Sequence, residues 1–422
     1  MSAIIVLFVV FTILCLLRVP IAVSLGLSSI VALFMVDFTL YTVGLKMFNA
    51  LNSATLMAIP GFVFAGVIMS KGGISFHLIE ALKSWVGHFR GGLAVVTILA
   101  CMIFAAISGS SPATAAAIGG IMIPAMVKAG YSKRYSMGLV AAAGTLGILI
   151  PPSIPLIIYA TVAEASVGKL FAAGIIPGLL LTSLLLCSAI FHARRHNYGR
   201  LEKVPFQLRW KKTYKAIWGF LLPVVILGGI YSGAVTPTEA AFVSCLYGLI
   251  VSIFIYKEMT FNKFREVLKE SINITAMIFL VIASAMVFGM FLTTEQVPQI
   301  FAQWIEASAA NKWIFIIGVN LMFFLLGMFL EATAIILITL PILLPVLVLF
   351  DINIIHFAII MTINMELAMI TPPVGLNLFV VSGITKEKIG EVIRGVVPFY
   401  LLMVVALILV IIFPEISLLL AE

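Results

Sequence analysis

Long apolar runs dominate the chain, and they predict membrane-spanning helices. An apolar stretch of about 20 residues is long enough to cross the hydrocarbon core of a bilayer, and shorter stretches suffice inside a bundle. Ten runs fit this description. They lie near residues 1–17, 20–36, 50–69, 134–163, 170–191, 216–234, 236–256, 271–292, 354–383 and 394–413. The pattern predicts an all-α polytopic membrane protein.

Two further apolar stretches, 92–127 and 312–349, are interrupted midway by small or polar residues. Their centres read ISGSSPAT (107–114) and LGMFLEATA (326–334). Each stretch is compatible with two full spans or with one re-entrant hairpin, and we count each as a hairpin. Two other segments, roughly 74–90 and 296–309, have the pattern of amphipathic helices that lie at the membrane interfaces.

The composition supports this interpretation. The chain of 422 residues is 63% hydrophobic and 10% charged, whereas an ordinary soluble domain is about half apolar and about a quarter charged. So few charges cannot cover the surfaces of several globular domains. The composition also excludes a disordered chain and a disulfide scaffold.

The basic residues predict the orientation in the membrane. The segment 192–215 contains a single acid, Glu202, and many basic residues. The basic residues are Arg194, Arg195, Arg200, Lys203, Arg209, Lys211, Lys212 and Lys215. The positive-inside rule places this segment in the cytoplasm. Counting outward puts both termini on the periplasmic side, and only Lys46, Lys169 and Lys312 of the 25 basic residues then fall outside. The charge therefore marks orientation and indicates no nucleic-acid partner.

The chain contains an internal repeat at an offset of 221 residues. Four prolines coincide when 109–177 is compared with 330–398. The pairs are Pro124 with Pro345, Pro151 with Pro372, Pro152 with Pro373, and Pro177 with Pro398. The halves 1–205 and 206–422 each hold five spans and one hairpin, so equivalent points have opposite orientation. Two inverted repeats of this kind are typical of secondary transporters, which bind their substrates at the repeat interface.

A double proline interrupts one helix in each half, within 134–163 and 354–383. The breaks read GTLGILIPPSIPL (144–156) and ELAMITPPVGLNL (366–378). Prolines remove backbone donors and unwind the helix, and the freed carbonyls suit a hard monovalent cation such as sodium. The N-termini of half-helices suit an anion. We therefore expect one sodium site in each half and an anionic substrate between the hairpin tips.

Structural explanations compete with this one. The double prolines could be simple kinks, and the small polar residues of the first tip could serve close helix packing. Glu239, Glu331 and Glu366 lie in apolar surroundings, where ionisable groups are functional by default, but Glu239 could cap a helix and Glu331 could bond its own tip. A proton relay would need more such groups than the chain offers.

Enzyme motifs do not stand out in the sequence. It has no HExxH pattern, no phosphate-cradling Gly-Lys-Ser/Thr motif and no marked Ser/His/Asp grouping. These patterns carry metal-dependent hydrolysis, nucleotide binding and acyl transfer. We therefore expect no enzymatic activity, no ATP-driven transport by this chain itself and no organic cofactor.

Several long stretches resemble the large membrane subunit of TRAP transporters, the tripartite ATP-independent periplasmic systems. The first is VGHFRGGLAVVTILACMIFAAISGSSPATAAAIGGIMIPAM (86–126), and the second is GTLGILIPPSIPLIIYATVAEASVGKLFAAGIIPGLLL (144–181). AIPGFVFAGVIMSKGG (58–73), TPTEAAFVSCLYG (236–248), LTTEQVPQ (292–299) and NMELAMITPPVGLNLFVVSGIT (364–385) extend the resemblance over nearly the whole chain.

The resemblance implies a sodium-coupled elevator fold in the bacterial inner membrane, in which a transport domain with both hairpins slides against a fixed scaffold. It implies two partners, a separate small four-helix membrane subunit and a periplasmic binding protein that delivers the substrate. The implied first sodium site comprises Ser108, Ser111, Gly147, Ile150 and Pro152, and the second comprises Gly327, Ala368, Thr371 and Val374. The implied substrate contacts are Ser110, Thr114, Ser153 and Asn377.

The motifs look most like those of the C4-dicarboxylate branch. Sialic-acid members often carry an acidic residue where this chain has Thr114, and a first tip with hydroxyls and no carboxylate suits a dianion such as succinate, malate or fumarate. One alternative is the same machine for sialic acid, another sugar acid or a keto acid. Alternatives of a different class are an intramembrane enzyme and a passive channel.

Overall fold

The computed structural model describes residues 2–36, 38–196, 198–199, 201–308 and 311–421, and these residues form helices and connecting segments without any strand. Arg200, one of the basic residues of the predicted cytoplasmic segment, lies outside the described residues. Within these described ranges, six helices are long and apolar enough to cross a membrane, or seven if one bent pair counts as a single span. The prediction of an all-α, multi-span chain is confirmed for this part of the chain.

The N-terminal third corrects one predicted span. Helices α1 (Ser2–Leu16) and α2 (Ile21–Phe34) coincide with the first two apolar runs, but the run 50–69 does not begin one helix. It contains the end of α3 (Leu40–Leu51), an irregular segment and then α4 (Ala58–Lys71). Asn52, Ser53 and Thr55 explain the break, because such side chains compete with the helical backbone for hydrogen bonds.

A sharp bend links α4 to the predicted amphipathic helix, which is α5 (Ile74–Val86). The two helices meet at 60°. Gly73 permits the bend, since its φ of 85° lies in the left-handed region that favours glycine. The second amphipathic prediction corresponds to α14 (Val297–Ala307).

Each interrupted apolar stretch is a pair of helices, and each is followed by a broken helix. The first pair is α6 (Gly92–Ser108) and α7 (Ser111–Lys128), and the second is α15 (Lys312–Gly327) and α16 (Ala332–Leu349). The first broken helix comprises α8 (Lys133–Gly144), a 3-10 turn (Thr145–Ile148) and α9 (Ile154–Ala163), and the second comprises α17 (Ile354–Met369) and α18 (Leu376–Thr385). The predicted breaks are therefore present at both double prolines.

The helix bounds recur at the offset of the proline pairs. Helix α7 begins at residue 111 and ends at 128, and α16 begins at 332 and ends at 349, which is 221 residues later at both ends. Each broken helix is followed by a long helix, α10 (Val167–Arg195) and α19 (Ile389–Ile412), and the short α20 (Glu415–Leu418) ends the series. The inverted orientation of the halves 1–205 and 206–422 stays a prediction.

Three helices follow in the middle of the chain, and the first and the last of them begin about ten residues before their apolar runs. They are α11 (Phe206–Tyr231), α12 (Pro237–Ile250), which continues as a π turn (Val251–Ile255), and α13 (Phe261–Thr294). The 34 residues of α13 span about 51 Å at 1.5 Å per residue, so this helix includes the charged residues 261–270, which lie between the predicted spans 236–256 and 271–292. Glu239 caps α12, because its Oε2 accepts a hydrogen bond of 2.7 Å from the Thr236 amide.

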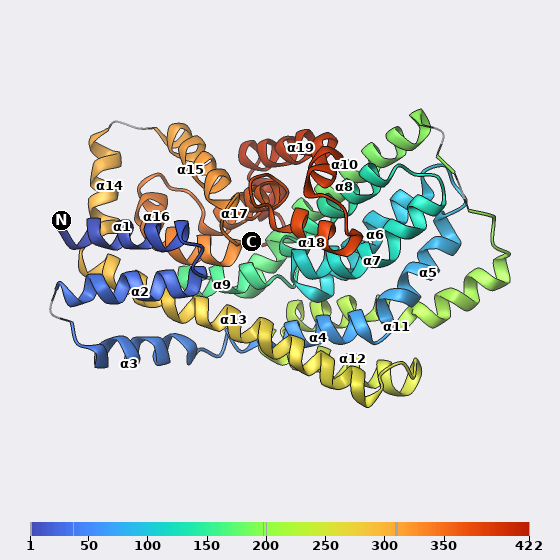
Figure 1. Cartoon of the computed structure of the whole chain (residues 1–422), viewed down its shortest axis with the longest axis horizontal. Helices are drawn as coiled ribbons and strands as arrows, with labels where there is room; N and C mark the ends of the chain where they lie inside the picture. Colours follow the sequence, from blue (N-terminus) through green and yellow to red (C-terminus); the bar gives the residue numbers. More distant parts are fainter. Residues whose placement is uncertain (1, 37, 197, 200, 309–310, 422) are drawn as a thin grey trace.

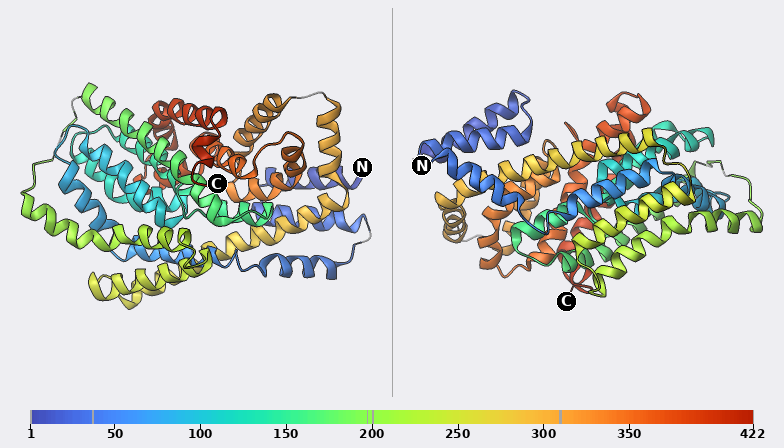
Figure 2. Two further views of the ribbon diagram at one scale, coloured as in Figure 1. Left: turned by 180° about the vertical axis from the view of Figure 1, so that it is seen from behind. Right: turned by 90° about the horizontal axis from the view of Figure 1, so that it is seen from below.

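The helices form two groups that pack against each other (Figures 1 and 2). The first group contains α1–α4 and α11–α13, in which the long α13 crosses α2, α3 and α4. The second contains the two helix pairs, the two broken helices, α10 and α19. Helix α5 packs against both α11 and α6, and α14 packs against α13 and α16, so each amphipathic helix bridges the two groups.

Candidate functional site

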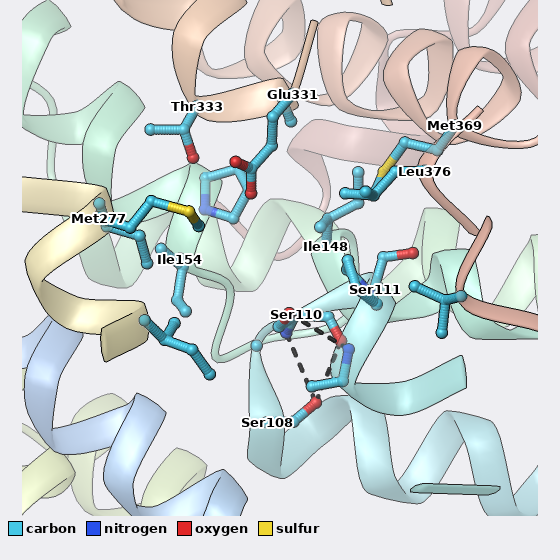
Figure 3. A pocket seen from close by; sticks show the side chains of 18 of the residues that line it. Ser108, Ser110, Ser111, Ile148, Ile154, Met277, Glu331, Thr333, Met369 and Leu376 are labelled. Carbon is cyan, nitrogen blue, oxygen red and sulfur yellow. Dashed lines mark hydrogen bonds between the residues drawn. The ribbon is translucent and has the colours of Figure 1, made fainter. Parts of the chain in front are cut away.

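A cavity of about 590 Å³ lies where the two helix groups meet. Ile21 of α2, Gly66 of α4 and Met277 of α13 line it from the first group. The tips of both helix pairs and the ends of both broken helices line it from the second (Figure 3). The volume is in the range of small-molecule sites, about 300–1,000 Å³.

Four helix N-termini converge on this cavity. Helices α7, α9, α16 and α18 all begin at its wall, where Ser111, Ile154, Ala332 and Leu376 are lining residues. A helix N-terminus carries a partial positive charge and free backbone amides. Among the described residues that line the cavity, none has a cationic side chain. Among these described residues, positive potential therefore comes from the backbone, which suits an anion, whereas the carboxyl groups of Glu270 and Glu331 oppose one.

The hydroxyls of the first tip form one hydrogen-bonded cluster. The Thr114 hydroxyl donates to the Ser110 carbonyl at 2.9 Å, and the Ser108 Oγ lies 2.9 Å from Thr114 Oγ1. Ser110 is the N-cap of α7, and its side chain accepts from the amide of Ala113 at 3.5 Å. Figure 3 shows Ser108, Ser110 and Ser111 together on one side of the cavity. The cluster fixes the tip through local contacts.

The first helix break packs closely against this tip. A Cβ at Gly147 would lie 2.5 Å from the Ser110 carbonyl oxygen, so only glycine permits the approach. On the other side of the break, the Ile154 amide donates to the Gly109 carbonyl at 3.2 Å, and a Cβ at Gly109 would lie 2.8 Å from the Pro152 carbonyl oxygen. Four of the five residues predicted for the first sodium site, all but Ile150, therefore lie in or against the tip.

Ile150 has a different neighbour. Its side chain packs on Gly178 of α10, where an added Cβ would lie 2.7 Å from Ile150 Cγ1. All five predicted residues of the site, Ser108, Ser111, Gly147, Ile150 and Pro152, are buried. The atoms of this set that could coordinate an ion are hydroxyl and carbonyl oxygens, and such ligands suit a hard cation.

The second break repeats the arrangement with different residues. Gly327, at the end of α15, faces Ala368 so closely that an added Cβ would lie 2.5 Å from the Ala368 Cβ. The Val374 amide donates to the Met328 carbonyl at 3.1 Å, which ties the break to the second tip. The Thr371 hydroxyl donates to the Leu367 carbonyl at 2.7 Å. The four residues predicted for the second sodium site thus lie on the second tip and the break that contacts it.

The predicted substrate contacts divide into two classes. Ser110 lines the cavity, but Thr114, Ser153 and Asn377 are fully buried behind its wall. Ser153 caps α9 and its hydroxyl bonds the Ile148 carbonyl, whereas Asn377 bonds Ser111 and the Ala141 carbonyl. Contact of these residues with substrate stays a prediction.

Sequence reasoning missed several residues on the wall. Glu270, Met277, Thr333 and Met369 line the cavity. Glu331, which the sequence did single out, faces the cavity from the second tip together with Thr333 (Figure 3). Glu270 lies directly before the predicted span 271–292, and no local pattern distinguishes it from the acids nearby. Its Oε2 accepts from Lys71 Nζ at 2.7 Å.

Glu366 is a separate case from these wall residues. Its side chain is fully buried in α17, and neither carboxyl oxygen has a hydrogen-bond partner among the described residues. Burying an isolated carboxylate is strongly unfavourable. The structure does not place Glu366 on the cavity wall.

Comparisons with known proteins identify relatives over nearly the whole chain. A family model described as "Tripartite ATP-independent periplasmic transporter, DctM component" matches residues 8–416. The C4-dicarboxylate TRAP transporter large permease protein DctM of Pseudomonas aeruginosa is 46% identical over 397 residues, which cover 94% of this chain and 93% of that protein. The sialic acid TRAP transporter large permease protein SiaM of Vibrio cholerae is 37% identical over 377 residues, covering 89% and 88%.

One solved structure shares the fold. The crystal structure of the YdaH transporter of Alcanivorax borkumensis, described as having an unusual topology, superimposes with a TM-score of 0.64. The match covers 96% of this chain and 98% of that one, at 16% sequence identity. At this identity the likeness concerns the arrangement of the helices alone.

Proposed function

The chain belongs to the DctM family, the large permease subunits of TRAP transporters, and we propose that it imports a C4-dicarboxylate across the bacterial inner membrane by sodium symport. Succinate, malate and fumarate are the favoured substrates. The family is one of transporters and not of enzymes. Both termini are proposed to lie in the periplasm, as the basic segment 192–215 predicts.

The observation that carries the proposal is the convergence of four helix N-termini on one cavity whose described wall lacks a cationic side chain. A dianion bound there would be held by backbone amides and helix dipoles. It would also be attracted by cations bound nearby, and that attraction supplies a physical reason for coupling. An anion that needs bound sodium to offset Glu331 and Glu270 is transported poorly without it.

The two breaks are the proposed sodium sites. Ser108, Ser111, Gly147, Ile150 and Pro152 would hold the first ion. Gly327, Ala368, Thr371 and Val374 would hold the second. These residues suit sodium because they offer oxygen ligands next to positions where glycine lets two backbone segments approach each other. Sodium is a cargo of the proposed transport cycle.

An elevator movement is supported by the division of the helices. Helices of both groups line the cavity. If the group with the hairpins moved relative to α2, α4 and α13, the tips and breaks that form most of the site would move with it. Helices α5 and α14 would serve as the flexible arms, because each contacts both groups. The exposed apolar side chains of α11, α12 and α13 face the lipid bilayer or a membrane partner.

The proposed partners follow from the family. They are a small four-helix membrane subunit and a periplasmic substrate-binding protein that delivers the carboxylate. No nucleic acid and no organic cofactor take part in the proposed cycle.

The experiment uses proteoliposomes that contain this chain and its small subunit, with purified binding protein and labelled succinate outside. We expect uptake that needs an inward sodium gradient and stops when the binding protein is omitted. Uptake that proceeds equally in potassium would contradict the sodium coupling. Uptake independent of the binding protein would contradict the tripartite cycle and would favour a passive channel.

A second candidate is import of sialic acid or another sugar or keto acid by the same machine. It is supported by the 37% identity with the sialic acid permease of Vibrio cholerae. Glu331 on the cavity wall also favours a substrate with hydroxyl groups, which can donate to a carboxylate. Competition of sialic acid with succinate for the binding protein and for uptake separates the two candidates.

A further inference from the structure

One side chain links the two halves of the chain at the proposed cation sites. Asn377 lies in the first turn of α18, directly after the second break, and it is fully buried. Its Nδ2 donates to Ser111 Oγ at 2.8 Å and to the Ala141 carbonyl at 2.9 Å. Ser111 begins α7 at the first tip, and Ala141 belongs to α8. Asn377 therefore holds two segments of the first half from a helix of the second.

The surroundings fix the orientation of the amide. The Ala141 carbonyl can only accept, so the nitrogen of the Asn377 amide must face it. The amide oxygen then lies 3.1 Å from Ser111 Oγ and accepts the hydroxyl hydrogen. A serine hydroxyl has one hydrogen and two lone pairs. With the hydrogen and one lone pair engaged by Asn377, a single lone pair of Ser111 remains for another partner.

The link has no counterpart at the repeat-related positions. At the offset of 221 residues, Asn377 corresponds to Leu156 and Ser111 corresponds to Ala332. Neither leucine nor alanine has a polar side chain that could form this bond. The connection therefore runs in one direction only, from the segment after the second break to the first tip.

Resting on the proposed sodium symport, we propose that Asn377 is a positioning residue that couples the two cation sites. Thr371 and Val374 of the second site lie six and three residues before it on the same segment. A cation that orders this segment also places the amide, and the amide aims the free lone pair of Ser111 toward the first site. Occupation of one site then raises the affinity of the other, as reciprocal coupling requires.

The test measures how uptake depends on sodium concentration in the reconstituted transporter. For the unaltered chain we expect a sigmoidal dependence with a Hill coefficient clearly above one. For Asn377→Ala and Asn377→Leu we expect the half-saturating sodium concentration to rise roughly tenfold and the Hill coefficient to fall to about one. Asn377→Leu keeps the branched shape of the side chain without its polar atoms and introduces the residue found at the equivalent position, Leu156, so it provides a second variant if the alanine variant does not fold.

A matched control removes another buried amide of the same half. Asn364 donates to the backbone and side-chain oxygens of Asn320, both at 2.9 Å, within the second half alone. We expect Asn364→Leu to lower thermal stability while the Hill coefficient stays that of the unaltered chain. A purely structural role for Asn377 would give the same result as this control and would overturn the inference.

A second readout avoids transport altogether. In the purified protein in detergent, we expect sodium to raise the melting temperature, and Asn377→Leu should shift the midpoint of that rise to roughly tenfold higher sodium. An unchanged midpoint and Hill coefficient in both Asn377 variants overturn the coupling alone. Loss of sodium dependence in the unaltered chain itself overturns the proposed symport, so the two failures are distinguishable.

Discussion

Gly147 lies against the carbonyl group of Ser110 so closely that a Cβ at position 147 would come within 2.5 Å of the oxygen. We expect Gly147→Ala to displace the first tip, at a cost of about 1–3 kcal/mol for overpacking, and to lower sodium-dependent uptake at least about tenfold. Gly120→Ala in α7 is the control, because nothing lies within 4 Å of the added Cβ. Equal uptake by both variants would contradict a site at this contact.

Glu331 places a carboxyl group at the second tip, four residues after Gly327. The carboxylate lines the cavity and makes no capping hydrogen bond to its own helix. Because the charge favours a cation nearby, Glu331→Gln should raise the half-saturating sodium concentration roughly tenfold, equivalent to about 1.4 kcal/mol. Glu331→Asp keeps the charge and should keep the sodium dependence. The sodium titration of uptake measures both, and a Gln variant identical to the unaltered chain would refute the electrostatic role.

Lys71 and Glu270 form an ion pair of 2.7 Å beside the cavity. Such partly exposed pairs contribute about 0–1 kcal/mol to stability, so Glu270→Gln should leave the melting temperature almost unchanged. It should, however, leave a less neutralised lysine that retains an anion and lowers the maximal uptake rate about two- to fivefold. Glu266→Gln is the control, since Glu266 lies 3.7 Å from Lys71 Nζ and does not line the cavity.

The difference between these two variants should shrink in high salt, because salt screens exposed charges. Initial uptake rates at two concentrations of choline chloride measure this dependence at constant sodium. If Glu270→Gln transports at the same rate as Glu266→Gln in low salt, the ion pair of Lys71 with Glu270 does not influence release of the transported anion.

Helices α8 and α19 approach each other backbone to backbone. A Cβ at Gly138 would lie 1.9 Å from the Gly395 carbonyl oxygen, and ion pairs of Lys133 with Glu387 and of Arg134 with Glu391 flank the contact. We expect Gly138→Ala to destabilise the protein by about 1–3 kcal/mol and to lower its melting temperature. Gly390→Ala, where the added Cβ meets open space, should be neutral or slightly stabilising. Thermal unfolding of the purified variants decides between these outcomes.

Much of the fold follows from local patterns in the sequence. The apolar runs, the small polar tip residues and the double prolines predicted helices that are interrupted at the tips and at the double prolines, and the structure has these interruptions, although it also breaks the predicted span 50–69. The predictions failed where a helix continues through charged residues, as α13 does from residue 261. Apolar runs report the part of a helix that lies in hydrocarbon and are silent about its extensions into water.

The composition of the cavity wall was only partly predictable. Ser108, Ser110 and Ser111 stand out because hydroxyls interrupt an apolar stretch. Glu270 and Met277 do not stand out, since they reach the cavity only because α13 packs against α4 and α16. Thr114, Ser153 and Asn377 have the residue types of a ligand site but are buried behind its wall.

The sequence by itself determined where the chain forms helices, where it breaks them and which residues are small or polar at those breaks, because these properties depend on neighbours along the chain. Only the tertiary structure decided which helix breaks and tips contact each other. The bond between Ser111 and Asn377 joins residues 266 positions apart, and the cavity exists because two groups of helices pack together there. Periodicity carries no information about such distant pairs, since packing selects them among many sterically possible ones.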